Sequence, residues 1–99
     1  MTNKQNRTVV EIIDGDTFRV SPEWNLGNAT GDRVRPTGYN TPEKGEAGYQ
    51  EAKDRLGNLI LDKVVTLSNP IKITRGRLLC DVFIDGKYLA DFFPDFLTD

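Results

Sequence analysis

The sequence RTVVEIIDGDTFRV, residues 7–20, places a Val- and Ile-rich segment directly before an Asp-Gly pair. β-Branched residues favour strands, and an Asp-Gly pair between two apolar segments is a strong signal for a tight turn that joins antiparallel strands. We therefore expect a strand over residues 7–13, a turn at Asp14-Gly15 and a return strand over residues 17–20.

Strand signals recur later in the chain. The further segments with strand character are 32–39, 63–67, 71–74 and 77–84. Pro36 favours an edge position or a bulge in the first of these, and a second turn pair, Asp85-Gly86, follows the last one. Residues 21–31 contain Pro, Asn and Gly, so we expect a loop there. Residues 40–48 are expected to form another loop.

Residues 47–62 carry the clearest helical pattern. Apolar side chains recur there at helical spacing, with charged side chains on the opposite face; the apolar ones are Tyr49, Ala52, Leu56, Leu59 and Ile60. Near the other end of the chain, Pro94 stops any helix in the aromatic tail after a turn or two.

Five short strands and one central helix are typical of a small closed barrel of the oligonucleotide-binding (OB) type. The predicted class is therefore β-rich α+β: a five-stranded OB-type barrel with one main helix, about residues 47–62, and a short C-terminal helical turn. A chain of 99 residues is long enough for one core only. We expect a single domain over residues 1–99, with disorder left open at residues 1–6 and 95–99.

Composition excludes several classes of function. The chain has no histidine, which excludes Ser-His and Cys-His nucleophiles and histidine-ligated zinc. Its single cysteine, Cys80, lies in an apolar run and is expected to be a small buried hydrophobe. No apolar run is long enough to cross a bilayer, and the polar residues 1–7 are not typical of a secretory signal. We therefore expect a cytoplasmic protein without a membrane partner.

The net charge of −2 counts against a role in nucleic-acid binding, because such binding draws much of its affinity from Lys and Arg. A basic surface would have to be local. The evident basic cluster of the sequence is Arg33, Arg35, Arg75 and Arg77.

Two short motifs and one dipeptide place chemistry-bearing side chains in order along the chain. They are Asp14-Gly15-Asp16-Thr17, then RPTGYNTPE at residues 35–43, then Gly76-Arg77. Each alone has a plain structural explanation as a turn or a loop. Together they supply oxygen ligands, a carboxylate base and guanidinium groups, which are what the hydrolysis of a phosphodiester needs.

The oxygen-bearing residues suggest a site for Ca²⁺, the expected cofactor. Ca²⁺ accepts oxygen ligands in flexible geometry. We expect Asp16, the amide oxygen of Asn40 and the carbonyl oxygen of Thr41 to share the ion, and Asp14 to hydrogen-bond water or a ligand behind them.

The remaining residues of the motifs suit the chemical step. Glu43 is the candidate that positions or deprotonates the attacking water. Arg35 and Arg77 suit the phosphate and the extra charge of the pentacoordinate transition state, because a guanidinium group binds phosphate oxygens in pairs.

In this order, the motifs resemble those of the staphylococcal (thermonuclease-like) nuclease family over roughly residues 8–90. The resemblance implies an OB-type barrel and the same roles at the matching positions. It also implies a Ca²⁺-dependent endonuclease that cleaves single-stranded DNA or RNA without sugar specificity and leaves 3′-phosphates.

Two positions depart from the family pattern. Asn40 stands where an aspartate ligand is expected, and the loss of one negative charge predicts Ca²⁺ binding weaker by about 10-fold or more. Arg75 stands where an aromatic side chain often stacks on a base. We expect Arg33 and Arg75 to contact phosphates, and Trp24 or Tyr39 to stack instead; packing over the barrel is the plainer alternative for Trp24.

The aromatic tail allows two interpretations. Phe92, Phe93 and Phe96, with Leu97, could cap the open barrel, or they could form an apolar patch that joins two copies into a homodimer.

Two alternatives to a nuclease stay open. One is a non-catalytic barrel of the same fold that binds nucleic acid or a protein, which the net charge and Asn40 favour. The other is a structural subunit assembled through the aromatic tail. The presence of Asp16, Arg35, Glu43 and Arg77 together favours the enzyme.

Overall fold

The computed structural model describes residues 4–98, and its first two strands form the predicted hairpin. Strand β1 (Gln5–Asp14) pairs antiparallel with β2 (Thr17–Leu26), and Asp14 lies opposite Thr17. The turn therefore consists of two residues, Gly15 and Asp16. Asp16 lies at the tip of the hairpin, and the rest of the candidate site is built around it.

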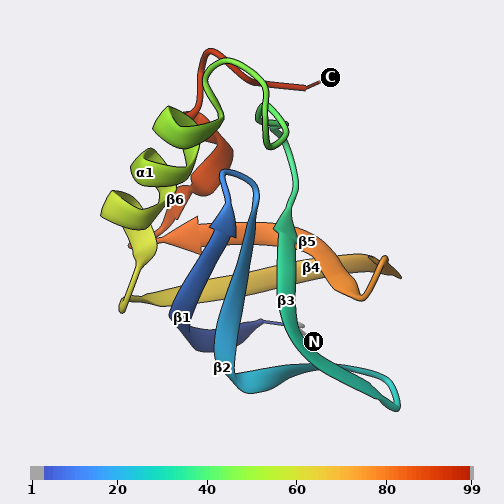
Figure 1. Cartoon of the computed structure of the whole chain (residues 1–99). Helices are drawn as coiled ribbons and strands as arrows, with labels where there is room; N and C mark the ends of the chain where they lie inside the picture. Colours follow the sequence, from blue (N-terminus) through green and yellow to red (C-terminus); the bar gives the residue numbers. More distant parts are fainter. Residues whose placement is uncertain (1–3, 99) are drawn as a thin grey trace.

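The remaining strands close the hairpin into a barrel (Figure 1). They are β3 (Ala29–Pro36), β4 (Val64–Thr74) and β5 (Arg77–Ile84). The sheet runs β3-β2-β1-β4-β5 with antiparallel neighbours, and a parallel pairing of β3 with β5 completes the ring. This is a closed five-stranded mixed barrel of the OB type, as predicted. A two-residue strand, β6 (Lys87–Tyr88), is appended to β5 after the Asp85-Gly86 turn.

Two helical segments accompany the barrel. The main helix, α1 (Tyr49–Ile60), confirms the prediction for residues 47–62 with narrower bounds. It packs against β1, and it buries Ala52, Leu56 and Ile60. The predicted C-terminal turn is the 3₁₀ helix η1 (Leu89–Phe92).

The loop expected at residues 21–31 is wrong, because β2 continues to Leu26 and β3 already begins at Ala29. Trp24 explains the difference. Its side chain is 1% exposed, and its indole N–H donates to the carbonyl oxygen of Arg33 at 2.7 Å. A break in the pairing register between Arg19 and Trp24 accommodates Pro22. The break expected at residues 68–70 is likewise an irregularity within a continuous β4.

Strand β5 shows the clearest division between the core and the outer face. Leu78, Cys80, Val82 and Ile84 are buried, whereas the residues between them are partly exposed. Cys80 is fully buried, as predicted, and burial raises the pKa of its thiol to about 12. By the same alternation, Arg77 begins the row of outward-facing side chains.

The aromatic tail packs onto the core. Phe93 is fully buried and stacks on Tyr39, with ring centroids 4.3 Å apart. Phe92 and Phe96 are partly buried against the same core. Because Phe93 is enclosed, the tail supports the capping interpretation, whereas Leu97 remains 56% exposed.

The two chain ends considered for disorder are in part held by contacts. Gln5 and Asn6 belong to β1, and near the other end the Thr98 amide donates to the carbonyl oxygen of Gly38 at 2.9 Å. Residues 1–3 and 99 lie outside the described residues. Within residues 4–98, neither helical segment has both the length and the apolar character needed to span a bilayer.

Candidate active site

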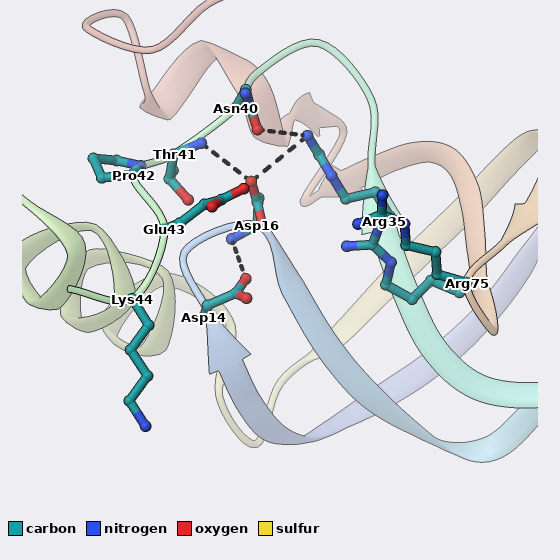
Figure 2. A pocket seen from close by; sticks show the side chains of 10 residues that line it. Asp14, Asp16, Arg35, Asn40, Thr41, Pro42, Glu43, Lys44 and Arg75 are labelled. Atoms are coloured by element: carbon teal, nitrogen blue, oxygen red, sulfur yellow. Dashed lines mark hydrogen bonds and ion pairs between the residues drawn. The ribbon is translucent and has the colours of Figure 1, made fainter. Parts of the chain in front are cut away.

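A polar hollow of about 400 Å³ lies where the β1–β2 turn, β3, the loop after β3 and the β4–β5 turn meet (Figure 2). Its lining residues are Asp14, Asp16, Arg35, Asn40, Thr41, Pro42, Glu43, Lys44, Arg75 and Arg77. The fold thus brings together every residue proposed above for metal binding or catalysis.

The β1–β2 turn presents Asp16 to this hollow. The Asp16 amide donates to Oδ1 of Asp14 at 3.1 Å, so Asp14 holds the backbone of the turn. The Asp16 residue is only 8% exposed. Burial, and then the nearby Asp16 carboxylate, raise the pKa of Asp14 above its usual range. The two carboxylates therefore lie close together in a partly desolvated turn.

Gly15 allows the loop after β3 to dock on this turn. A Cβ atom at Gly15 would lie 2.7 Å from Oγ1 of Thr41 and 2.8 Å from Cβ of Ala52. Both distances are shorter than a real Cβ contact. The Tyr39 hydroxyl, which is buried, donates to the Gly15 carbonyl oxygen at 2.9 Å. Only glycine permits this approach, which carries Asn40 and Thr41 to Asp16.

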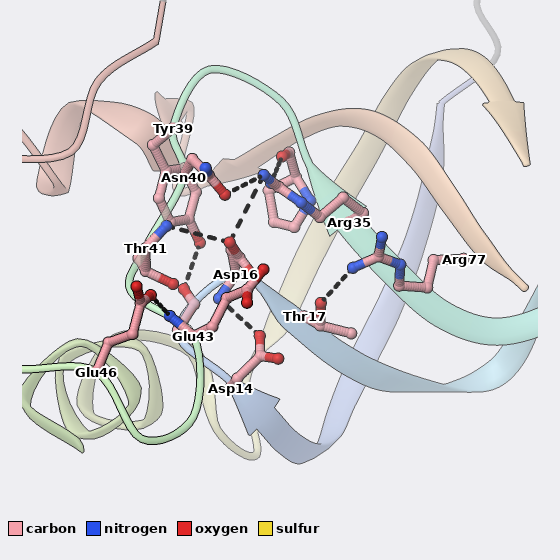
Figure 3. Close-up of polar contacts among 12 residues, drawn as sticks. Asp14, Asp16, Thr17, Arg35, Tyr39, Asn40, Thr41, Glu43, Glu46 and Arg77 are labelled. Carbon is pink, nitrogen blue, oxygen red and sulfur yellow. Dashed lines mark hydrogen bonds and ion pairs between the residues drawn. The ribbon is translucent and has the colours of Figure 1, made fainter. Parts of the chain in front are cut away.

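Asp16 is then bound from two sides (Figure 3). The Thr41 amide donates to its Oδ2 at 3.1 Å, and Nη2 of Arg35 lies 3.6 Å from the same oxygen. That nitrogen also donates to Oδ1 of Asn40 at 3.2 Å. Arg35 therefore bridges two of the proposed metal ligands.

Glu43 extends from the loop with its carboxylate unengaged. Its amide donates to Oε1 of Glu46 at 2.6 Å, and the Glu46 amide donates to the Glu43 carbonyl oxygen at 2.9 Å. These bonds fix the backbone of Glu43, whose side chain is directed toward Asp16 (Figures 2 and 3). Among residues 4–98, no hydrogen bond uses the Glu43 carboxylate, so its oxygens are available to water.

Arg77 reaches the hollow from the start of β5. Its Nη1 donates to Oγ1 of Thr17 at 3.1 Å. Thr17 begins β2, which pairs with the edge of β3 opposite to β5. The buried Nε of Arg77 has no hydrogen-bond partner among the described residues. Arg75 precedes it in the β4–β5 turn, is exposed, and has a positive φ of 53°. Nη2 of Arg77 and the guanidinium group of Arg75 form no hydrogen bond among residues 4–98, so these donors are left for an anion.

Three predicted nucleic-acid contacts lie outside the hollow. Trp24 and Tyr39 are each 1% exposed. The Trp24 indole is bonded to the backbone and the Tyr39 ring is covered by Phe93, so the structure makes neither ring available to stack on a base. Arg33 is exposed on the outer face of β3. Both aromatic residues belong to the core instead.

The structure adds residues that sequence reasoning missed. Lys44 lines the hollow, and its position directly after Glu43 was the available signal. Thr17 orients Arg77, and nothing in the sequence pattern links two residues so far apart. Thr41 also lines the hollow, and its buried Oγ1 has no hydrogen-bond partner in the described part of the chain.

The donor set suits a hard cation with a preference for oxygen. Asp16 supplies a carboxylate, Asn40 an amide oxygen, and Thr41 a carbonyl and an unpartnered hydroxyl, which are ligand types that Ca²⁺ accepts. No group of three or more His, Cys, Asp or Glu side chains within residues 4–98 could hold a metal. A site with one carboxylate fits Ca²⁺ in its chemistry, and it should bind weakly.

No protein-family model matches the chain, and no curated protein matches it significantly.

Proposed function

We propose that the protein is a Ca²⁺-dependent phosphodiesterase of the thermonuclease-like type that cuts single-stranded DNA or RNA. One observation carries the proposal. Asp16, Glu43, Arg35 and Arg77, which come from four separate segments, line the same hollow together with the oxygen donors of Asn40 and Thr41.

Arg35 and Arg77 bind the phosphate of the substrate. Arg35 and Arg77 can each donate two hydrogen bonds to phosphate oxygens, and charge-assisted bonds of this kind are among the strongest available to a protein. Because negative charge grows on the phosphate as water attacks, the same donors stabilise the transition state more than the bound substrate.

Glu43 acts as the general base. Its backbone is fixed by the bonds with Glu46, so the carboxylate is held near the phosphate with little loss of freedom. It accepts a proton from the water molecule whose oxygen then attacks phosphorus. The bond between phosphorus and the ribose or deoxyribose 5′-oxygen then breaks. The leaving oxygen takes a proton from solvent water, and the other product carries a 3′-phosphate.

Asp16, Asn40 and Thr41 would hold Ca²⁺. When bound, the cation would act as a Lewis acid that draws electron density from a phosphoryl oxygen. Arg35 contacts both Asp16 and Asn40, so this arginine and the cation compete for the same oxygens.

A non-catalytic module that binds nucleic acid is the second candidate, and one observation favours it. Asp16 is the only carboxylate among the proposed cation ligands, and its charge is already balanced in part by Nη2 of Arg35 at 3.6 Å. Such a site could hold a phosphate chain without cleaving it.

The deciding experiment is digestion of denatured DNA and of RNA, with millimolar Ca²⁺ or with a chelator, by the wild-type protein and by Glu43→Gln. We expect Ca²⁺-dependent cleavage that leaves 3′-phosphates, and a loss of about 10²- to 10⁴-fold in the variant. Arg77→Gln should lose about 10²- to 10³-fold.

Glu23→Gln is the matched control, because Glu23 is an exposed acid on β2 outside the lining of the hollow. It should cleave like the wild type. Binding of single strands without cleavage at any Ca²⁺ concentration would contradict the enzyme and leave the binding module.

A further inference from the structure

The outer face of the barrel carries a row of arginines across three strands. In the pairing register, Arg33 of β3 lies opposite Arg19 of β2 on one side and beside Arg77 of β5 on the other. Partners in a register point to the same face of a sheet, and like charges placed side by side on one face repel each other. This arrangement is unfavourable for the folded chain alone.

Only one member of the row is neutralised within the described chain. Arg19 pairs with Glu11 at 2.6 Å and with Asp32 at 3.0 Å. None of the ion pairs formed among residues 4–98 involves Arg33 or Arg77. The uncompensated charge is therefore concentrated on β3 and β5.

A second level of the same face extends the charge to β4. Leu79 of β5 lies beside Arg35 of β3 and opposite Lys72 of β4. Lys72 is exposed, and like Arg33 it has no ion pair within the described chain. The basic face, defined here as Arg33, Arg35, Lys72 and Arg77, thus spans three adjacent strands.

The surface beside Lys72 is hollowed. A second depression of about 380 Å³ is lined in part by Lys72 and Leu79, and it shares Arg35 and Arg77 with the candidate active site. None of its lining residues is acidic. Arg35 and Arg77 therefore form a ridge between two depressions, of which only the first contains carboxylates.

We infer that the basic face binds the backbone of a single-stranded nucleic acid on both sides of the reacting phosphate. Lys72 holds a phosphate beyond the ridge, and Arg33 holds another along β3; neither residue belongs to the proposed catalytic set. The inference rests on the proposed function for the class of substrate. Its charge argument is independent, because a polyanion relieves the repulsion within the row.

The test measures binding rather than cleavage. Fluorescence anisotropy with a labelled twelve-nucleotide oligothymidylate, in chelator and over a range of salt, would compare the wild-type protein with Arg33→Gln, Lys72→Gln and the double variant. Each phosphate contact to a single strand contributes about 0.7 to the slope of log K against log salt. We expect the slope to fall by about 0.7 in each single variant and about 1.4 in the double one.

Three controls make the result specific. Lys63→Gln removes the same charge from an exposed position outside both depressions, and it should keep the wild-type slope. Arg33→Lys keeps the positive charge and should also keep the wild-type slope. A dinucleotide, which is too short to reach beyond the ridge on both sides, should bind all variants alike.

The inference is overturned if the slopes of Arg33→Gln and Lys72→Gln match that of Lys63→Gln, or if polyglutamate binds as tightly as the oligonucleotide. These outcomes are separable from failure of the proposed function. If the wild-type protein cleaves but the variants keep the wild-type salt slope, only the role of the basic face is contradicted. If the variants have reduced slopes but the wild-type protein does not cleave, only the proposed nuclease activity is contradicted.

Discussion

The two halves of the candidate site are built in different ways. The acidic half, at the β1–β2 turn, belongs to the core: Asp16 is nearly enclosed, and Tyr39 and Thr41 bond directly to the turn. The basic half, at the β4–β5 turn, lies on a hairpin end whose residues Arg75 and Gly76 are exposed.

The difference separates stability from binding. Asp16 and Thr41 of the acidic half are buried among packed side chains, so we expect these two residues to be preorganised, whereas Asn40 is exposed. The turn of the basic half is exposed, so we expect it to accept substitutions with little change in stability. Substitutions in the first half should therefore affect folding, whereas those in the second should affect mainly ligand binding.

Phe93→Ala should produce the largest effect, because it removes the ring on which Tyr39 stacks. Truncation of a fully buried phenylalanine typically costs about 3–5 kcal/mol of unfolding free energy, measured by urea denaturation. Leu97→Ala is the matched control, since that side chain is 56% exposed, and it should stay within about 0.5 kcal/mol. Equal losses in the two variants would contradict the packing described for the tail.

A pair of glycine substitutions compares the two turns directly. Gly15→Ala forces a Cβ against Thr41 and Ala52 and should cost about 1–3 kcal/mol, as overpacking does. Gly76→Ala meets no atom within 4 Å, and its φ of 76° imposes only local strain of about 1 kcal/mol. Calorimetry should also show weaker Ca²⁺ binding in the first variant alone. Unchanged Ca²⁺ affinity in Gly15→Ala would show that the docking of the loop after β3 on the β1–β2 turn does not position the proposed Ca²⁺ ligands.

Asn40→Asp sharpens the comparison within the acidic half. The substitution places a second carboxylate among the proposed Ca²⁺ ligands, so Ca²⁺ binding should tighten by about 10-fold, or about 1.4 kcal/mol, by titration calorimetry. Asn28→Asp, on the exposed β2–β3 turn, adds the same charge elsewhere and should leave the affinity unchanged. If both variants bind like the wild type, the placement of Ca²⁺ at Asn40 is wrong.

The smallest effect should be a dependence of stability on pH at the tail. Arg55 donates to both carboxylate oxygens of Asp95, at 2.8 and 3.1 Å, and these bonds hold the pKa of Asp95 below its ordinary value of 3.8. A lowered folded-state pKa stabilises the protein above 3.8, and this contribution is lost as the pH falls through the folded value. Melting temperatures of Asp95→Asn should therefore decline less on acidification than those of the wild type. Parallel declines would show that the pair contributes nothing.

Much of the fold could be predicted from local signals. The hairpins around Gly15 and Gly86 and the helical spacing around Leu56 follow from local signals, and all three were confirmed. The first turn, however, consists of Gly15 and Asp16 rather than Asp14 and Gly15. The strand through Trp24 was missed because Pro22 and the neighbouring glycines read as a loop. The burial of Trp24 against the backbone of β3 outweighs that local tendency.

The candidate site was predictable in its residue types and less so in its contacts. The order of Asp16, Asn40, Glu43 and Arg77 along the chain suggested one site, and the structure places all four in one hollow. The burial of Tyr39 depends on Phe93, more than fifty residues away in sequence. No local pattern encodes such a contact.

The parallel pairing of β3 with β5 has a consequence for how the site comes into being. β3 pairs with β2 and with β5, and β5 is the more distant of the two in sequence. Arg35 and Arg77 become neighbours only when β3 and β5 meet and close the ring. Contacts between residues far apart in sequence tend to form late, because they carry the largest loop-closure entropy. If an anion binds between the two arginines, as proposed, it should stabilise the pairing of β3 with β5, and hydrogen exchange of the amides in these strands should slow when phosphate is present.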